Sequence, residues 1–276
     1  MTSRQELDRE YSPSRLARDA AGTLARYRDE SAAARRRLDC ELDVPYGPSP
    51  DERLHWFPPL LPGAPLLVFV HGGHWQESSK EDACFPAPGL IAAGAGYVAL
   101  GYGLAPRRGL PEMAASVRRG LRWVRAHARD LGSRPDRVHA AGSSAGAHLV
   151  ALAVTGPEPA EVAGACLLSG VYDLEPVRHS YVNDALGLDA RAAADHSPLR
   201  RLPLRVPDVL VARGRHETRE YARQHALLLG ALRATGQRAT GLVAADRDHF
   251  DLPLDLGRPR TPLGRAVLGR LGLEDG

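Results

Sequence analysis

The sequence predicts an α/β fold, in which a mainly parallel β-sheet carries helices on both faces. Strand-like apolar runs alternate with helical stretches along most of the 276 residues, an order typical of this class. Several of the strand-like runs, such as residues 66–70, are apolar at every position, as expected for strands buried on both faces of a parallel sheet. A chain of this length suits one large core. We therefore expect residues 1–276 to form a single domain.

The first 37 residues are rich in Ala and Arg and precede the first strand-like run. Apolar side chains at Leu16, Ala20, Leu24 and Tyr27 recur at nearly helical spacing, which predicts one or two amphipathic helices. We describe residues 1–37 as an N-terminal helical arm. The arm would pack against the body of the fold or close over a site, and the sequence does not distinguish the two.

The sheet is expected to begin with a hairpin. Residues 38–44 and 52–57 alternate apolar and polar side chains on either side of a cluster of Gly, Pro and Ser, which predicts two antiparallel strands at a sheet edge. Further strands are expected at 66–70 and 97–102. A long amphipathic helix is expected at 113–131.

The second half of the chain continues the alternation. We expect strands at 137–141, 163–170, 209–214 and 239–245, and helices at 147–154, 221–234 and 263–271. Residues 172–206 contain no clear strand. Because long connections in compact folds usually serve as lids or binding loops, we expect this segment to be a lid-like binding insertion before the next strand.

A Gly-x-Ser-x-Gly motif occupies residues 142–146, between an expected strand and an expected helix. This context is typical of a nucleophile elbow, a sharp turn that holds the serine hydroxyl above the carboxyl edge of the sheet. The motif makes Ser144 the candidate nucleophile. It also specifies the fold class as an α/β-hydrolase fold.

A serine hydroxyl needs a neighbouring base, which a third group must orient. In α/β-hydrolases these groups follow the serine in the order acid, then histidine. Glu217 follows the strand expected at 209–214, and His249 follows the strand expected at 239–245. These positions predict a triad of Ser144, Glu217 and His249. Asp173, which follows the strand expected at 163–170, is the alternative acid.

The buried strand at 66–70 leads directly into His71-Gly72-Gly73. An HGG-type turn at this place contributes backbone amides to an oxyanion hole in enzymes of this fold. We predict that an amide of Gly72 or Gly73, together with the amide of Ala145, stabilises the negative charge on the tetrahedral intermediate.

Four aromatic or imidazole side chains are candidates for the substrate pocket. His74 and Trp75 follow the oxyanion turn, and Tyr172 and Tyr181 belong to the expected insertion. A flat ring at the mouth of the pocket would offer a stacking surface to a planar substrate.

The composition indicates which classes of binding partner to expect. The net charge of +3 comes from arginines interleaved with acidic residues, which is typical of solvated helix faces and does not suggest nucleic-acid binding. No stretch is apolar for long enough to span a membrane, and the polar start of the chain lacks a signal peptide, so we expect a cytoplasmic protein. The three cysteines and the histidines show no metal-ligand spacing, so no metal or other cofactor is expected.

The sequence resembles the kynurenine formamidases, or arylformamidases, of the α/β-hydrolase superfamily. The resemblance extends from about residue 11 to about residue 256. It rests on five motifs in order: YSPS at 11–14, HGGHWQ at 71–76, GSSAG at 142–146, LSGVYDLEP at 168–176 and DHFD at 248–251. One departure concerns the pocket, because the family usually has Tyr where this chain has His74.

The resemblance implies hydrolysis of an N-formyl arylamine, such as N-formylkynurenine, to formate and the free aniline through a formyl-serine intermediate. It places the family's nucleophile, acid and histidine on Ser144, Glu217 and His249. Two readings remain open beside it: a carboxylesterase acting on small or aromatic esters with the same triad, and a binding protein that has kept the fold without catalysis. A formamidase for modified tryptophan metabolites is a related reading. The sequence does not determine the oligomeric state, and a homodimer is one of the possibilities.

Overall fold

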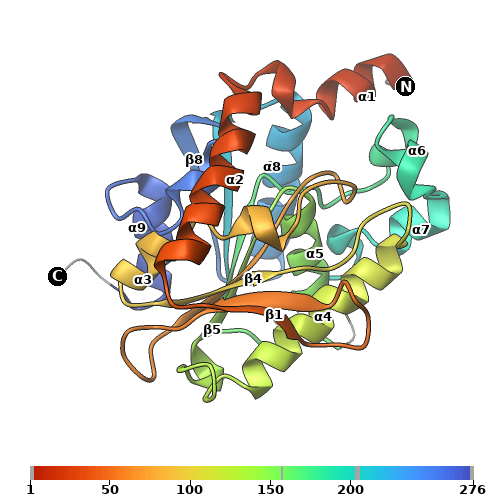
Figure 1. The fold of residues 1–276 in the computed structure, drawn as a ribbon. Helices are drawn as coiled ribbons and strands as arrows, with labels where there is room; N and C mark the ends of the chain where they lie inside the picture. Colours follow the sequence, from red (N-terminus) through yellow and green to blue (C-terminus); the bar gives the residue numbers. More distant parts are fainter. Residues whose placement is uncertain (1–2, 157, 203–205, 274–276) are drawn as a thin grey trace.

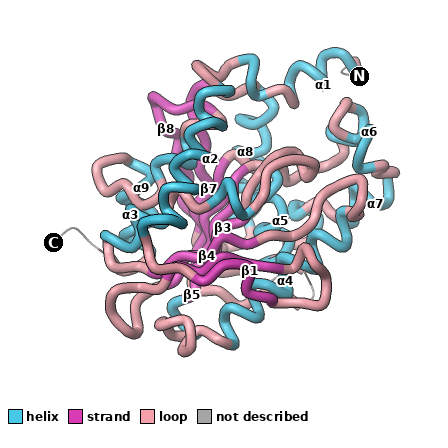
Figure 2. The backbone as a smooth tube through the Cα atoms, viewed as in Figure 1, coloured by secondary structure: helices cyan, strands magenta, loops and turns pink. Residues whose placement is uncertain are grey.

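The computed structural model describes residues 3–156, 158–202 and 206–273 (Figure 1). These residues form an eight-stranded sheet in the order β1-β2-β4-β3-β5-β6-β7-β8. The strands are β1 (Glu41–Pro45), β2 (Arg53–Phe57), β3 (Leu66–Val70), β4 (Gly96–Leu100), β5 (Val138–Ser143), β6 (Gly164–Leu168), β7 (Asp208–His216) and β8 (Ala239–Asp248). From β4 to β8 all neighbours in the sheet are parallel. Figure 2 shows the strands in magenta, with helices around them in cyan. The predicted α/β-hydrolase sheet is confirmed.

The predicted hairpin lies at one edge of the sheet. Strand β1 pairs antiparallel with β2, which pairs antiparallel with β4. The amide of Tyr46 donates a hydrogen bond to the carbonyl of Glu52 across the connecting turn. The remaining helices and strands then alternate along the chain.

Nine α-helices of the described residues accompany the sheet. They are α1 (Arg4–Glu10), α2 (Ala20–Arg37), α3 (Ala87–Ala92), α4 (Leu110–Ala126), α5 (Ala145–Val154), α6 (Asn183–Leu186), α7 (Ala190–Asp195), α8 (Arg219–Ala234) and α9 (Pro262–Arg270). The helix predicted at 113–131 begins earlier, because Glu112 accepts a hydrogen bond from the amide of Gly109 and caps the first turn. It also ends earlier, at Ala126, where the chain passes into turns.

Two hydrophobic cores lie on opposite faces of the sheet. Val68 of β3 belongs to the core formed with α4, α5 and α8, whereas its neighbours Leu67 and Phe69 belong to the core formed with α2, α3 and α9. Successive side chains of a strand point to opposite faces, so a strand that is apolar throughout supplies both cores. This explains the continuous apolar run at 66–70.

The N-terminal arm and the insertion lie near each other at one end of the molecule, where Figure 1 draws α1 close to α6. Arg4 of α1 forms an ion pair with Asp184 of α6, at 2.6 Å. The described part of segment 172–206 contains short helices and no strand; residues 203–205 lie outside the described residues. Among the described helices, none is both long and apolar enough to cross a bilayer.

Candidate active site

Ser144 lies in a sharp turn between β5 and α5. Its backbone angles, φ 54° and ψ −118°, are unfavourable for a residue with a side chain, and such strain is characteristic of functional turns. The flanking glycines are required by close packing. A Cβ atom on Gly142 would lie 2.5 Å from the carbonyl oxygen of Gly146, and one on Gly146 would lie 2.0 Å from that of Val70. The turn thus has the geometry of the predicted nucleophile elbow.

Glu217 follows β7 and its carboxylate is buried beside the imidazole of His249. The Oε2 atom lies 3.2 Å from His249 Nδ1. The other oxygen, Oε1, accepts hydrogen bonds from Ser169 Oγ at 2.7 Å and from the amide of Gly214 at 2.6 Å. Donors of this kind stabilise a buried carboxylate. The carboxylate is therefore held in place to orient His249.

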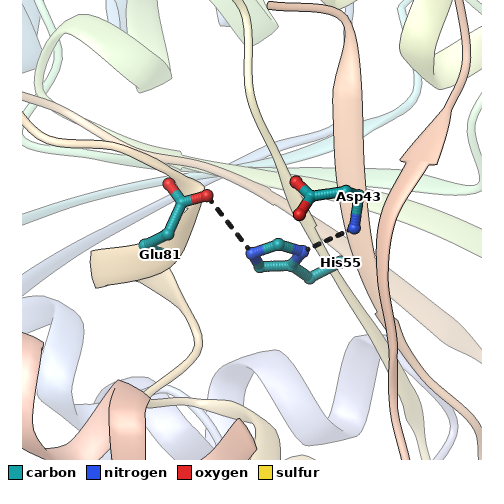
Figure 3. A group of neighbouring side chains, drawn as sticks. All are labelled: Asp43, His55 and Glu81. Carbon is teal, nitrogen blue, oxygen red and sulfur yellow. Dashed lines mark hydrogen bonds and ion pairs between the residues drawn. The ribbon is translucent and has the colours of Figure 1, made fainter.

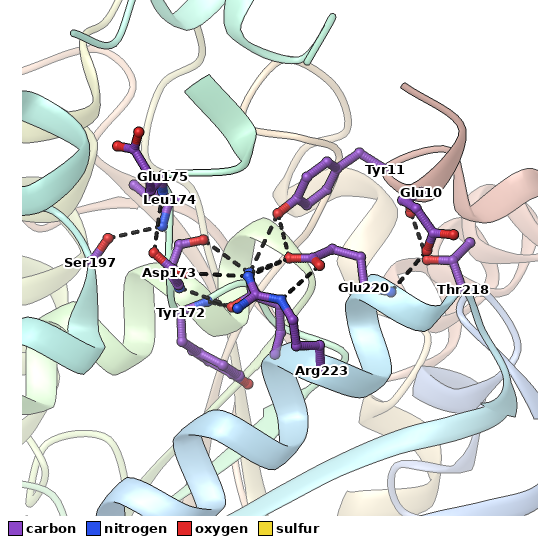
Figure 4. Close-up of polar contacts among 11 residues, drawn as sticks. Glu10, Tyr11, Tyr172, Asp173, Leu174, Glu175, Ser197, Thr218, Glu220 and Arg223 are labelled. Carbon is purple, nitrogen blue, oxygen red and sulfur yellow. Dashed lines mark hydrogen bonds and ion pairs between the residues drawn. The ribbon is translucent and has the colours of Figure 1, made fainter. Parts of the chain in front are cut away.

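Asp173, the alternative acid, has different partners. Its carboxylate pairs with the guanidinium of Arg223 at 3.2 Å, and its amide donates to the side-chain oxygen of Gln224. Figure 4 shows this network beside α8. The structure pairs His249 with Glu217 and leaves Asp173 in an ion pair.

Ser144 and His249 line one cavity of about 440 Å³. Both side chains are buried, at 6% and 5% exposure. Among the hydrogen bonds of the described residues, none joins Ser144 Oγ to His249. Catalytic hydrogen bonds are often long before substrate binds, so the cavity brings the two groups together without closing that bond.

The predicted oxyanion loop lies against the elbow. Gly72 and Gly73 line the cavity with Ser144, and a Cβ atom on Gly72 would lie 3.1 Å from Cβ of Ser144. Ala145 is the first residue of α5, so its amide is one of those that a helix leaves without an internal partner. In the described chain, we find no loop or side-chain acceptor bonded to the amides of Gly72 or Gly73. These amides are free to bind a substrate oxygen.

His71 stabilises the same loop. Its Nδ1 atom lies 2.9 Å from the carbonyl oxygen of Gly72, and its ring stacks on Tyr102 with centroids 4.4 Å apart. Burial lowers the pKa of His71 to about 4. The neutral ring orients the loop and lies outside the triad.

Two of the four predicted pocket residues line the cavity. His74 and Tyr181 both contact it, and their rings meet edge to face with centroids 6.1 Å apart. His74 belongs to the oxyanion loop and Tyr181 to the insertion, so the pocket is closed by segments from different parts of the chain.

The prediction for Trp75 and Tyr172 is wrong, because both side chains are buried in the core and neither lines the cavity. The backbone of Trp75 is left-handed, with φ 62°. Its buried indole donates a hydrogen bond to His148 Nδ1 at 3.2 Å. Tyr172 lies back against its own chain, since a Cβ atom on Gly170 would approach its hydroxyl to 2.4 Å.

Tyr221, which belongs to none of the predicted site motifs, lies beside His249 and Ser144. Its hydroxyl is 3.4 Å from His74 Nε2, and its ring lies over His249 with centroids 4.5 Å apart. Burial strongly raises the pKa of the Tyr221 hydroxyl, and a hydrogen bond with Ser144 lowers it to a smaller extent. The phenol is therefore neutral. Its position in the first turn of the helix that directly follows Glu217 is the sequence signal that could have identified it.

His74 is also neutral, because burial and the neighbouring His249 lower its pKa to about 4. Its partners are the Tyr221 hydroxyl and the backbone carbonyl of Tyr11. The hydroxyl of Tyr181 donates to the same Tyr11 carbonyl at 3.1 Å. One carbonyl of the N-terminal arm thus lies beside both of these side chains.

The arm also forms a wall of the cavity. Ala20, Leu24 and Tyr27 of α2 line it, and the ring of Tyr27 stacks on Phe85 with centroids 4.3 Å apart. The hydroxyl of Tyr27 donates to the carbonyl of Phe250, next to the triad histidine. The arm therefore closes over the site.

Polar contacts anchor the arm to α8. The Tyr11 hydroxyl donates to Glu220 at 2.8 Å, and the amide of Glu220 donates to the carboxylate of Glu10 at 2.9 Å. Arg223 pairs with Glu220 as well, as the network in Figure 4 shows. These residues join the arm to the helix that follows the catalytic acid.

One further group brings metal-binding residue types together, namely Asp43, His55 and Glu81 (Figure 3). His55 Nδ1 accepts a hydrogen bond from the amide of Asp43 at 3.1 Å, so the proton of the neutral ring is on Nε2, which faces Glu81 at 3.5 Å. The ammonium of Lys80 pairs with both carboxylates. The group is organised as an ion-pair cluster around Lys80.

Comparisons with known proteins identify relatives of this chain. A family model described as BD-FAE matches residues 61–187. A kynurenine formamidase from Danio rerio is 32% identical and covers 98% of this chain and 97% of its own length. Esterase LipQ from Mycobacterium tuberculosis is 38% identical over 48% of this chain and 35% of its own length. A solved structure from Silicibacter sp. TM1040 has a TM-score of 0.82 at 25% identity and covers 94% of this chain and 98% of its own.

The near full-length match to a kynurenine formamidase is the most informative of these similarities. Together with the sheet order and the elbow, this match indicates a hydrolase of amide or ester bonds. The chain belongs to the kynurenine formamidase family of α/β-hydrolases.

Proposed function

We propose that the protein hydrolyses an N-formyl arylamine, with N-formylkynurenine as the substrate, to formate and the free aniline. The observation that carries this proposal is the geometry of the cavity. Ser144 and His249 line it beside the Gly72-Gly73 loop, and Glu217 orients His249 from the far side. An aromatic wall lies on the same cavity.

In the first half-reaction, Ser144 Oγ attacks the formyl carbon while His249 accepts the serine proton. Glu217 stabilises the imidazolium that forms. The formyl oxygen takes up negative charge and is stabilised by the amides of the oxyanion loop and of Ala145. Loss of one such donor typically costs about 3 kcal/mol of transition-state stabilisation.

The intermediate collapses when His249 delivers its proton to the aniline nitrogen. The C–N bond breaks, the neutral aniline leaves, and Ser144 carries the formyl group as an ester. His249 then removes a proton from water, which attacks the formyl carbon. Formate leaves and the proton returns to Ser144 Oγ, so the enzyme is restored.

A formyl group is the smallest acyl group, so specificity must come from the leaving-group side of the substrate. The cavity of about 440 Å³ far exceeds what a formyl group fills. The stacked pair Tyr27 and Phe85 and the nearby Phe250 give that volume a flat aromatic surface. Such a surface suits an aryl leaving group.

A carboxylesterase is the second candidate. It is favoured by the similarity to esterase LipQ and by the fact that the triad does not determine the acyl group. An esterase would place its acyl chain in the volume that we assign to the aryl group.

The test compares formate release from N-formylkynurenine with hydrolysis of a short-chain aryl ester, in wild type and in Ser144→Ala. We expect formamide turnover to exceed ester turnover, and both to fall by about 10⁴-fold or more in the variant. Thermal unfolding of Ser144→Ala controls for its fold. Ester hydrolysis without formate release would assign the protein to the esterases.

A further inference from the structure

Two exposed, charged side chains line the cavity. Arg28 of α2 is the one Arg or Lys side chain among the described residues that line the cavity, and Glu77 lies on it as well. Within the described chain, neither side chain takes part in an ion pair or a side-chain hydrogen bond. The third charged group on the cavity, Asp82, already accepts a hydrogen bond from Ser79.

Arg28 differs in this respect from its neighbour on the same helix. Arg26 pairs with Glu30 at 2.8 Å along the outer surface of α2. Arg28 follows Tyr27, whose ring forms part of the aromatic wall. The helix thus presents an aromatic ring and a cation to the cavity from consecutive positions.

Glu77 is held close to the reacting end of the cavity by its backbone. Its amide donates a hydrogen bond of 2.9 Å to the carbonyl of Gly73 in the oxyanion loop. A Cβ atom on Gly73 would lie 2.2 Å from the carbonyl oxygen of Glu77, so the two segments are packed tightly. The backbone of Glu77 is therefore tied to the loop, and its exposed side chain extends from this fixed point.

The cavity consequently combines one unpaired cation, one unpaired anion and an aromatic wall. We propose that Arg28 and Glu77 form a subsite for a zwitterionic α-amino-acid group carried by the aryl side of the substrate. Arg28 binds the carboxylate, for which its guanidinium geometry is suited, and Glu77 binds the ammonium. This inference rests on the proposed function, and what it adds is the assignment of Arg28 and Glu77 as the residues that select for the charged groups on the aryl side of the substrate.

The experiment compares two substrates that share the reacting group. N-Formylkynurenine carries the amino-acid group, whereas 2-formamidoacetophenone has the same formanilide and ring ketone without it. The measured quantity is the ratio of their kcat/KM values. We expect this ratio to fall about tenfold in Arg28→Gln and in Glu77→Gln, mainly through a higher KM for N-formylkynurenine.

Arg26→Gln is the matched control, since it removes an arginine two residues away that does not line the cavity. Its ratio should equal that of wild type. Arg28→Lys keeps the charge and should retain part of the ratio. The carboxamide of N-formylkynurenine isolates one contact, because it lacks the carboxylate and should be cleaved equally well by wild type and Arg28→Gln.

The two proposals fail in different ways. An unchanged ratio in both Arg28→Gln and Glu77→Gln, with 2-formamidoacetophenone still cleaved, would overturn the subsite and leave the formamidase in place. A wild-type protein that cleaves neither formamide would remove the proposed function and the subsite together.

Discussion

The proposed catalytic groups and the side chains that line the cavity around them are held by different kinds of contact. Ser144, Glu217 and His249 each follow a parallel strand of one sheet, and the carboxyl ends of such strands share an edge. The pocket is assembled differently. Its walls come from the N-terminal arm, the oxyanion loop and the insertion, which polar contacts over long sequence separations hold together.

This difference predicts how substitutions will act. A change at the sheet edge should alter the rate of the chemical step with little effect on folding, because the strands are set by the core. A change in the arm should lower stability or substrate affinity, because hydrogen bonds, an ion pair and a few buried side chains keep the arm in place.

The largest effect expected is that of replacing the triad acid. Glu217→Gln keeps the shape of the side chain but removes the charge that stabilises the imidazolium, so kcat should fall by about 10³-fold. Asp173→Asn is the matched control and should stay within about threefold of wild type, since Asp173 pairs with Arg223. Steady-state kinetics of both variants decide the point, and a larger loss in Asp173→Asn would reverse the assignment of the acid.

The arm can be loosened at one hydrogen bond. Tyr11→Phe removes the hydroxyl that donates to the buried Glu220, and hydrogen bonds to charged groups typically contribute about 2 kcal/mol. Urea unfolding should show a loss of about that size. Tyr181→Phe removes a hydroxyl from a partly exposed side chain and should cost less. Equal losses would mean that the Glu220 contact does not anchor the arm.

Tyr221 joins the two parts of the site. Tyr221→Phe keeps the ring against His249 and removes the hydroxyl beside His74 and Ser144, so kcat/KM should fall about tenfold with stability nearly unchanged. If the hydroxyl positions Ser144, the loss should appear in kcat and the pH profile should shift. An unchanged kcat would reduce Tyr221 to a packing residue.

The smallest effect concerns acid stability. Burial lowers the pKa of His148 to about 3, while its unfolded value is about 6.5. Below pH 6.5 the unfolded chain binds a proton that the folded chain does not, so stability is full above this pH and falls toward pH 3. One such histidine contributes a loss of about 0.8 kcal/mol at pH 6.0.

Denaturant unfolding at pH 8 and pH 6 measures that loss. His148→Gln should reduce the difference between the two pH values, whereas substitution of the exposed His179 should leave it unchanged. Other histidines whose pKa is lowered by burial, such as His71 and His74, keep part of the difference in this variant, so only a difference as large as that of wild type would contradict the prediction for His148.

Much of the fold, and the placing of Ser144, Glu217 and His249 after successive strands of one sheet, could be predicted from the sequence, because both depend on local patterns. The elbow at 142–146 requires glycines at fixed positions, and the strand at 66–70 requires apolar side chains at every position. Tertiary packing decided the rest. Trp75 directly follows His74 in the chain, yet its indole is buried against His148 while His74 lines the cavity.

Other features depend on contacts that no local pattern encodes. The arm reaches the site through pairs such as Arg18 and Asp248, which are 230 positions apart. The cluster of Asp43, His55 and Glu81 forms only when the edge hairpin meets the loop after β3. Its residues are unremarkable in sequence, and only the folded chain brings them together.

The bond between Tyr27 and Phe250, across 223 positions, has a consequence for synthesis of the protein. Ribosomes add about 5–20 residues per second, so roughly ten to forty-five seconds separate the two partners on a nascent chain. Throughout that interval the aromatic face of α2 has been made but the loop that it covers has not. The active site is therefore completed after most of the chain has left the ribosome, and until then this face is available to chaperones.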